Sequence, residues 1–270
     1  MINFKHCLQI IRKDFLEMKS DKAIITSILP MSILFSLILP IVILLFGNHM
    51  EVITSINGLS AFLKNSNAFP VNENIKNGTT PLYLIFMYFF VPIFILLPVM
   101  VSNIIASYSF IGEKENRTLE SLLYTPINDA SLIIGKSLVA IVPSMLISWF
   151  SILIYGVLLD TLGYSVFGTI IFPNLTWIIL SFVVIPLIIL LSTLIVIVIT
   201  QRVNSSKSAQ SISMIIVLPI VGLLISQSVG AIIMGTRVLL LISLILLIFN
   251  IITFNIIIRM FNREKLVLNL

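Results

Sequence analysis

The sequence predicts an all-helical integral membrane protein with six transmembrane helices and both chain ends on the cytoplasmic side. The chain of 270 residues is 59% hydrophobic and only 10% charged, with a mean hydropathy of +1.16, whereas a soluble domain carries roughly 25% charged residues. Six apolar segments are long enough to cross the hydrocarbon core, which takes about 20 residues. Lysine and arginine are concentrated in alternate connections between these segments.

Residues 1–22 predict an amphipathic helix ahead of the first span. Apolar side chains recur on one face, at Phe4, Cys7, Leu8, Ile11, Phe15 and Met18. The opposite face carries Lys5, Arg12, Lys13, Asp14 and Lys19. A basic amphipathic helix of this kind lies in the membrane interface. A simple membrane anchor and a contact for a partner protein are both open as its role.

The six predicted spans lie in one membrane domain that covers residues 1–270. They are residues 23–47, 82–111, 132–159, 177–200, 211–228 and 238–258. Thirteen of the sixteen Lys and Arg residues precede the first span, follow the last, or flank the second-to-third and fourth-to-fifth connections. Because Lys and Arg stay on the cytoplasmic side, both termini are predicted inside. Residues 48–81 then form the one substantial external loop.

Proline occurs in nearly every span, Pro92 and Pro186 among them. A proline inside a soluble helix costs about 3 kcal/mol because it has no N–H and its ring clashes with the preceding turn. Membrane bundles tolerate proline because neighbouring helices supply partners for the freed backbone groups. Kinked spans are therefore the simplest expectation.

All eleven acidic residues lie in loops or at span ends, with Asp160 closest to membrane depth, and Lys136 near the start of the third span is the one charged residue inside the spans. Transporters driven by ion gradients usually keep titratable residues in the membrane, so energy for transport would come from elsewhere. The sequence shows no metal-ligand cluster and no nucleophile beside a base. We therefore predict no catalytic, cofactor-binding or metal residues. The run from Ala130 to Ser137 matches a relaxed phosphate loop, but it leads into an apolar span instead of following a strand.

Neutral polar residues within the spans are candidates for lining a translocation path. They include Asn103, Ser192, Thr193, Gln227 and Asn250. Hydrogen bonding between neighbouring helices explains such residues in most membrane proteins. Path lining and helix packing both remain open for them.

Residues 112–127, between the second and third spans, form the densest charged stretch of the chain. Leu119, Leu122 and Leu123 fall on one face of a short predicted helix, Glu113 can pair with Arg117 one turn later, and a proline ends the helix. A short helix with apolar and acidic side chains suits a groove on a soluble partner.

The order of residues here, Glu-x-Glu-x-x-Thr-Leu-Glu-x-Leu-Leu-x-Thr-Pro-Ile from Glu113 to Ile127 with Gly135-Lys136 at the next span, resembles the signature of ABC-2-type transporter permeases. Many members have Gly where this chain has Arg117. The resemblance implies a type V exporter-like fold, with residues 1–22 as the connecting helix and residues 112–127 as a coupling helix on an ATPase. The implied interface residues are Glu113, Glu115, Arg117, Thr118, Leu119, Glu120, Leu122 and Leu123.

By this resemblance the chain is the non-catalytic permease subunit of a prokaryotic ABC exporter in the plasma (inner) membrane. It implies a dimer, with a second copy or a paralogue, and a separate ABC ATPase subunit that holds ATP and Mg. No nucleic-acid partner is expected. The uncharged spans favour a hydrophobic or amphipathic cargo, such as a drug, an antimicrobial peptide or a lipid. Sodium or polysaccharide export by the same machinery, and a non-transporting sensor or enzyme, are the alternatives.

Overall fold

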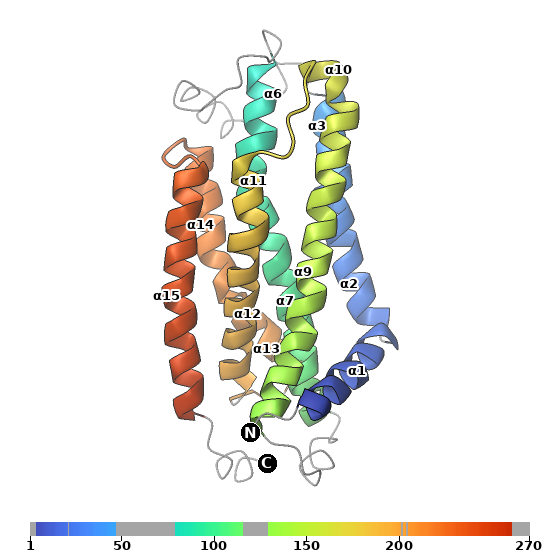
Figure 1. The fold of residues 1–270 in the computed structure, drawn as a ribbon, viewed down its shortest axis with the longest axis vertical. Helices are drawn as coiled ribbons and strands as arrows, with labels where there is room; N and C mark the ends of the chain where they lie inside the picture. The colour runs from blue at the N-terminus through green and yellow to red at the C-terminus, as the bar shows by residue number, and fades with distance from the viewer. Residues whose placement is uncertain are drawn as a thin grey trace.

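A computed structural model describes residues 4–20, 22–46, 79–115, 129–200, 202–203 and 205–260. Within these ranges all regular secondary structure is helical, and the long helices run side by side in an elongated bundle (Figure 1). Six helices are long and apolar enough to span a membrane: Ile25–Leu45, Thr80–Gly112, Ile134–Leu162, Leu175–Thr200, Ser206–Ser228 and Thr236–Ile257. The prediction of six spanning helices is confirmed, and the largest difference is the start of the fifth, at Ser206 instead of residue 211.

Several spans are made of consecutive helical segments. In chain order the elements are α1 (Phe4–Ser20), α2 (Lys22–Ile33), η1 (Leu34–Ile38), α3 (Leu39–Phe46), α6 (Thr80–Leu84), η3 (Ile85–Phe89), α7 (Phe90–Glu115), α9 (Asp129–Leu162), α10 (Tyr164–Phe167), α11 (Leu175–Ile179), η4 (Leu180–Val184), α12 (Ile185–Thr200), α13 (Ser206–Ser213), η5 (Met214–Ile216), α14 (Val217–Ser228) and α15 (Thr236–Met260). The predicted external loop, apart from its last three residues, lies outside the described residues.

Helix α1 is tilted away from the bundle axis and packs against α9 at one end of the bundle (Figure 1). Helix α15 finishes at this same end, which we call the terminal end. The opposite end, where α10 lies, is the far end. An even number of spans requires this arrangement, because each crossing moves the chain from one end to the other.

The second span, α6–η3–α7, is the centre of the bundle. Of its most apolar stretch 83% is buried, against 22% for the fifth and sixth spans. Large apolar side chains therefore cover the outside, as on α15, where Leu241 is 63% exposed. Such a surface is unfavourable in water but is matched by lipid tails. The pattern is that of a bundle whose outer helices face a bilayer.

Three of the spans widen into a π-helical turn just before a proline: η1 before Pro40, η3 before Pro92, and η4 before Pro186. A proline ring clashes with the carbonyl of the preceding turn, and a π-helical turn is a local widening of the helix. Each π segment includes the residue four positions before its proline, where that clash would occur. The widened turn leaves carbonyl groups that need other donors.

At Pro92 the other donors come from three different spans. Pro92 has no N–H for the carbonyls of Tyr88 and Met87, four and five residues earlier. Gln227 Nε2 of α14 donates to the Tyr88 carbonyl at 2.8 Å, and Trp177 Nε1 of α11 donates to the Met87 carbonyl at 3.1 Å. Tyr155 Oη of α9 donates to the neighbouring Phe86 carbonyl at 2.7 Å. The π turn η3 therefore holds the third, fourth and fifth spans against the second.

Aromatic rings fill the space around this turn. The ring of Tyr155 stacks on those of Trp177 and Phe90, at centroid distances of 4.8 and 5.4 Å. Phe94 packs edge-on against Trp177 at 5.1 Å. All four rings are buried. Offset and edge-to-face pairs of this kind add to the stabilisation that burial gives.

We predict that Gln227→Leu destabilises the bundle mainly by removing the donor that α14 supplies to the Tyr88 carbonyl. An unsatisfied buried acceptor costs about 1–3 kcal/mol, partly offset because the substitution also removes the unpaired Gln227 Oε1. In a Pro92→Ala background position 92 regains its N–H, so Gln227→Leu should cost less there. Unfolding in mixed micelles measures all four forms, with an expected coupling of about 1 kcal/mol.

The control is Ser228→Ala, because among the described residues the Ser228 hydroxyl bonds only to the Leu224 carbonyl of its own helix. Its cost should be the same whether position 92 is proline or alanine. Strict additivity of Pro92→Ala and Gln227→Leu would contradict the proposed role of the glutamine as a donor that replaces the missing N–H.

Candidate functional site

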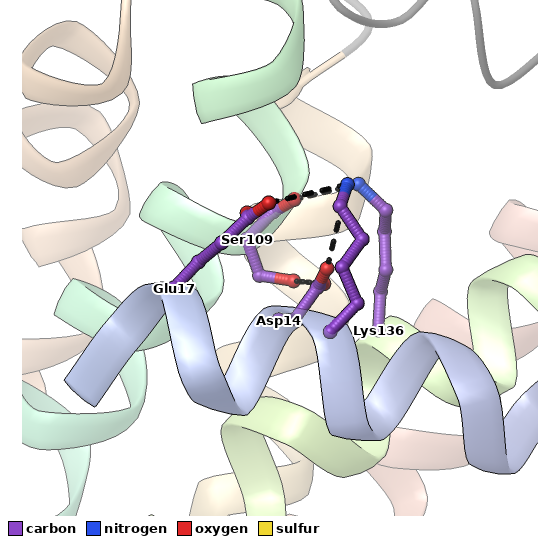
Figure 2. Close-up of polar contacts among 5 residues, drawn as sticks. Asp14, Glu17, Ser109 and Lys136 are labelled. Atoms are coloured by element: carbon purple, nitrogen blue, oxygen red, sulfur yellow. Dashed lines mark hydrogen bonds and ion pairs between the residues drawn. The ribbon is translucent and has the colours of Figure 1, made fainter. Parts of the chain in front are cut away.

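Three polar side chains from three helices meet at the terminal end, beneath α1. Asp14 comes from α1, Ser109 from the last part of α7, and Lys136 from the first part of α9 (Figure 2). All three are buried. We call this group the junction. It lies near the two helix ends between which the predicted coupling helix runs.

Lys136 brings a cation into the protein interior. Its side chain is 1% exposed, and Nζ donates to the Ser109 carbonyl at 2.7 Å. The same nitrogen lies 5.9 Å from the centre of the Phe110 ring, within range of a cation–π contact. A buried cation is costly unless it is bonded and its charge is compensated. The protein must therefore provide hydrogen-bond acceptors and compensating charge around Lys136.

Asp14 supplies the opposite charge from α1. It is 6% exposed, and one carboxylate oxygen accepts a hydrogen bond from Ser109 Oγ at 2.8 Å. Ser109 thus donates its hydroxyl to the anion and offers its carbonyl to the cation. The two charged groups are linked through one residue, and α1 is tied to both α7 and α9. The other carboxylate oxygen of Asp14 lies 4.0 Å from Nζ of Lys13, a lysine of the same helix that is 42% exposed.

The predicted faces of the N-terminal helix need correction here. Asp14, assigned to the polar face, is buried beside Ile10, whereas Leu8 and Phe15 of the predicted apolar face are 65% and 46% exposed. The reason is that α1 meets three environments: the end of the bundle, the membrane interface and water. One side packs on the bundle end, where Lys136 requires an anion, and its outward apolar side chains suit the membrane interface.

The predicted ATPase interface is only partly within the described residues. Helix α7 continues through Glu115, so Glu113 and Glu115 belong to the last turn of the second span. The other predicted interface residues, Arg117, Thr118, Leu119, Glu120, Leu122 and Leu123, lie outside the described residues. The run from Ala130 to Ser137 lies inside α9, and its lysine is the buried Lys136. A continuous helix there offers no loop of free N–H groups to a phosphate.

The five candidate path residues are all buried. Three of them connect spans: Asn103 donates to the Gln210 carbonyl at 3.2 Å, Gln227 to Tyr88, and Asn250 to the Leu187 carbonyl at 2.9 Å. Thr193 donates to the Leu190 carbonyl of its own helix. No hydrogen bond within the described part of the chain joins any two of the five. These contacts are those of helix packing, and path lining stays a prediction.

Some of these residues keep spare hydrogen-bonding capacity. The side-chain oxygens of Ser192, Gln227 and Asn250 are buried, and the described residues offer them no hydrogen-bond partner. A buried acceptor without a donor costs free energy. If a molecule crossed the spans, its hydrogen-bond donors would therefore gain the most free energy at these three oxygen atoms.

A polar hollow opens at the far end of the bundle, which the sequence did not indicate. Its volume is about 570 Å³, and its polar lining residues are Tyr83, Tyr88, Asn174, Thr176 and Thr236. The two threonine hydroxyls lie 3.3 Å apart and join the fourth and sixth spans. These residues belong to three spans and one connection, so no local pattern could have brought them together.

Metal chemistry has no candidate centre in the described ranges, where no three His, Cys, Asp or Glu residues lie close enough to hold an ion. Comparison with known proteins adds no assignment: no protein-family model matches the chain, and no curated protein matches it. The functional argument therefore depends on the coupling motif, the helical layout and the geometry described above.

We predict that Lys136→Met loosens α1 from the bundle, because Ser109, which holds Asp14 of α1, would lose the donor on its carbonyl while a side chain of similar length is kept. The readout is maleimide labelling of Ile10→Cys in a Cys7→Ser background, since Ile10 is only 5% exposed. Labelling should rise several-fold. Lys136→Arg should raise it less, and Arg12→Met, at an exposed position of α1, should leave it unchanged. Equal labelling in all variants would remove the proposed role of the junction.

Proposed function

We propose that this chain is the permease subunit of an ATP-binding cassette exporter of the ABC-2 type. It would form the translocation path as a dimer, with a second copy or a paralogue, and take its energy from a separate ATPase subunit. The observation that carries the proposal is the Glu113–Ile127 motif between the second and third spans. Six spanning helices and an amphipathic helix at the terminal end agree with it.

In this proposal the terminal end faces the cytoplasm of a prokaryotic cell. Its support is the distribution of Lys and Arg, most of which flank that end of the spans. The coupling helix would then lie where a soluble ATPase can reach it, directly after the last turn of α7. ATP and Mg would be held by that partner, and the present chain would carry out no catalysis.

The junction gives this proposal a mechanical basis. Ser109 lies six positions before the end of α7, and Lys136 lies seven positions after the start of α9. Movement of the segment between these helices would act on both residues, and through Asp14 on α1. A tightly packed and hydrogen-bonded contact transmits displacement as a rigid body. Closure of the ATPases would therefore move the start of the third span and α1 together.

The cargo class follows from the lining that the spans can offer. Their interior polar groups are neutral amides and hydroxyls, and aromatic rings dominate the core. A hydrophobic or amphipathic cargo fits these surroundings best. Ions such as sodium need several convergent oxygen ligands, so a sodium cargo fits these surroundings less well. A sensor or enzyme without transport is the alternative if no ATPase partner exists.

The first test is the ATPase partnership. The tagged chain is purified from its native membrane in mild detergent and reconstituted with the ATPase that accompanies it. We expect a partner with a phosphate loop, and ATP hydrolysis that the permease stimulates. Absence of any such ATPase would contradict the proposed function and favour the sensor or enzyme.

The second test concerns the coupling helix. Replacing Glu113 and Leu119 together by alanine should lower permease-stimulated ATPase activity at least several-fold, because both the acidic and the apolar contact to the partner are removed. The matched control replaces Glu51 and Leu59, a similar pair in the predicted external loop, and should have no effect. Normal turnover in the first variant would remove the coupling assignment.

The third test separates the junction from nucleotide binding. Lys136→Ala should leave the KM for ATP of the complex unchanged, because the lysine is buried within α9, whereas the maximal rate should fall. A large rise in KM would instead revive the interpretation of residues 130–137 as a phosphate loop.

A further inference from the structure

An apolar groove lies between α9 and the α11–η4 segment, in the half of the bundle toward the far end. Its volume is about 430 Å³. The residues that define it are Trp149, Leu153, Asp160, Phe172, Trp177 and Phe182. Asp160 is the one charged residue among those that line it. The groove adjoins the polar hollow, because Phe172 and Pro173 line both.

The groove has the length and depth of one membrane leaflet. Asp160 and Trp149 are eleven positions apart on α9, which corresponds to about 16 Å along a helix. The hydrocarbon core is about 30 Å thick, and Trp149 lies close to the midpoint of the span Ile134–Leu162. The groove therefore runs from the membrane midplane to the level of the lipid headgroups, where Asp160 lies.

The walls of the groove present hydrocarbon and no free hydrogen-bonding groups. Trp149 Nε1 is bonded to the Ser181 carbonyl at 2.9 Å and Trp177 Nε1 to the Met87 carbonyl. The Ser181 hydroxyl donates to the Trp177 carbonyl. Gly156 lets the Phe172 ring close the wall, because a Cβ at this position would collide with that ring. The interior of the groove thus suits an apolar chain.

Asp160 differs from the junction carboxylate because the described part of the protein gives it no cation. One oxygen accepts the backbone N–H groups of Ile171 and Phe172, at 3.2 and 3.1 Å. No Lys, Arg or His in the described part of the chain forms an ion pair with Asp160, and its second oxygen accepts no hydrogen bond there. At the headgroup level, a carboxylate without a cation of its own is a favourable partner for a positively charged group.

We propose that this groove binds an amphipathic cation, with its apolar chain along Trp149, Leu153 and Phe182 and its cationic head on Asp160. A zwitterionic phospholipid fits less well, because its phosphate would lie near the carboxylate. A second copy of the chain packing here would bury the carboxylate against apolar side chains. Binding requires no ATPase and stands apart from the proposed function. Only the further step, that such cations are cargo taken from the outer leaflet, rests on it.

The chain provides its own probe for this site, because Trp149, one of its two tryptophans, is partly exposed in the groove, whereas Trp177 beside it is fully buried. The full chain is placed in phosphatidylcholine nanodiscs without any ATPase and titrated with dodecyltrimethylammonium that carries bromine on its chain. Bromine quenches tryptophan on contact, so we expect saturable quenching at low concentration. Brominated dodecyl maltoside, which is uncharged, should quench only at concentrations at least tenfold higher.

Matched variants identify the two parts of the site. Asp160→Asn keeps an oxygen for the N–H groups of Ile171 and Phe172 but loses the charge, and should weaken binding of the cation at least tenfold. Asp160→Glu should retain most of the affinity. Leu153→Phe should reduce quenching by both amphiphiles because it fills the groove. Leu241→Phe, an equally exposed position on α15, should have no effect.

Two results would overturn the proposal. Equal quenching by the cation and the maltoside, unchanged by Asp160→Asn, would show ordinary contact with membrane lipid. Tryptophans shielded from every amphiphile, together with a crosslink between two Leu153→Cys chains, would show that a second copy covers the groove. Either result leaves the ATPase tests of the proposed function unaffected.

Discussion

The packing of the bundle depends on one missing hydrogen, the N–H that Pro92 lacks. In water such a gap would be filled by solvent, but in the hydrocarbon core each backbone carbonyl must find its donor within the protein. The widened turn η3 leaves the Met87 and Tyr88 carbonyls available, and Trp177 and Gln227 supply the donors. Since these donors come from different spans, the defect in one helix becomes the point that fixes its neighbours. The aromatic cluster around Tyr155 then fills the remaining space.

The same logic is repeated at Pro186, where Trp149 donates to the Ser181 carbonyl of η4. Both tryptophans of the chain are thus held by carbonyls that a proline-induced turn makes available. Their N–H groups are used for packing, and of the two rings only that of Trp149 keeps exposed surface in the groove. The apolar character of the groove is in this way a consequence of how the proline kinks are stabilised.

Buried or membrane-level charge is confined to the two ends of the described spans, and the two ends treat it differently. At the terminal end Lys136 and Asp14 are both hydrogen-bonded to Ser109, and Asp14 also has an ion pair with Lys13. At the far end Asp160 is held by backbone N–H groups but has no cation from the described residues. The first arrangement suits a fixed mechanical contact between helices. The second arrangement suits a binding site for a positively charged molecule.

The number of spans, their approximate ends and the presence of an amphipathic first helix were all predictable, because hydrophobic length and helical periodicity are properties of consecutive residues. The coupling motif is likewise a local pattern, although most of it lies outside the described residues. Its function in contacting an ATPase is a matter for experiment. Asn103, Gln227 and Asn250 were recognised as polar residues in the membrane, but their bonding partners were not.

What the sequence by itself determined is therefore an all-helical chain that crosses a membrane six times. The tertiary structure decided which carbonyl each amide reaches, which side of α1 is buried, and that Asp160 and two tryptophans share one groove. The physical reason is the distance along the chain: Gln227 and Tyr88 are 139 positions apart, and Asp14 and Ser109 are 95 apart. In lipid, where unbonded polar groups are costly, such distant pairs select one packing among the many that six apolar helices would allow.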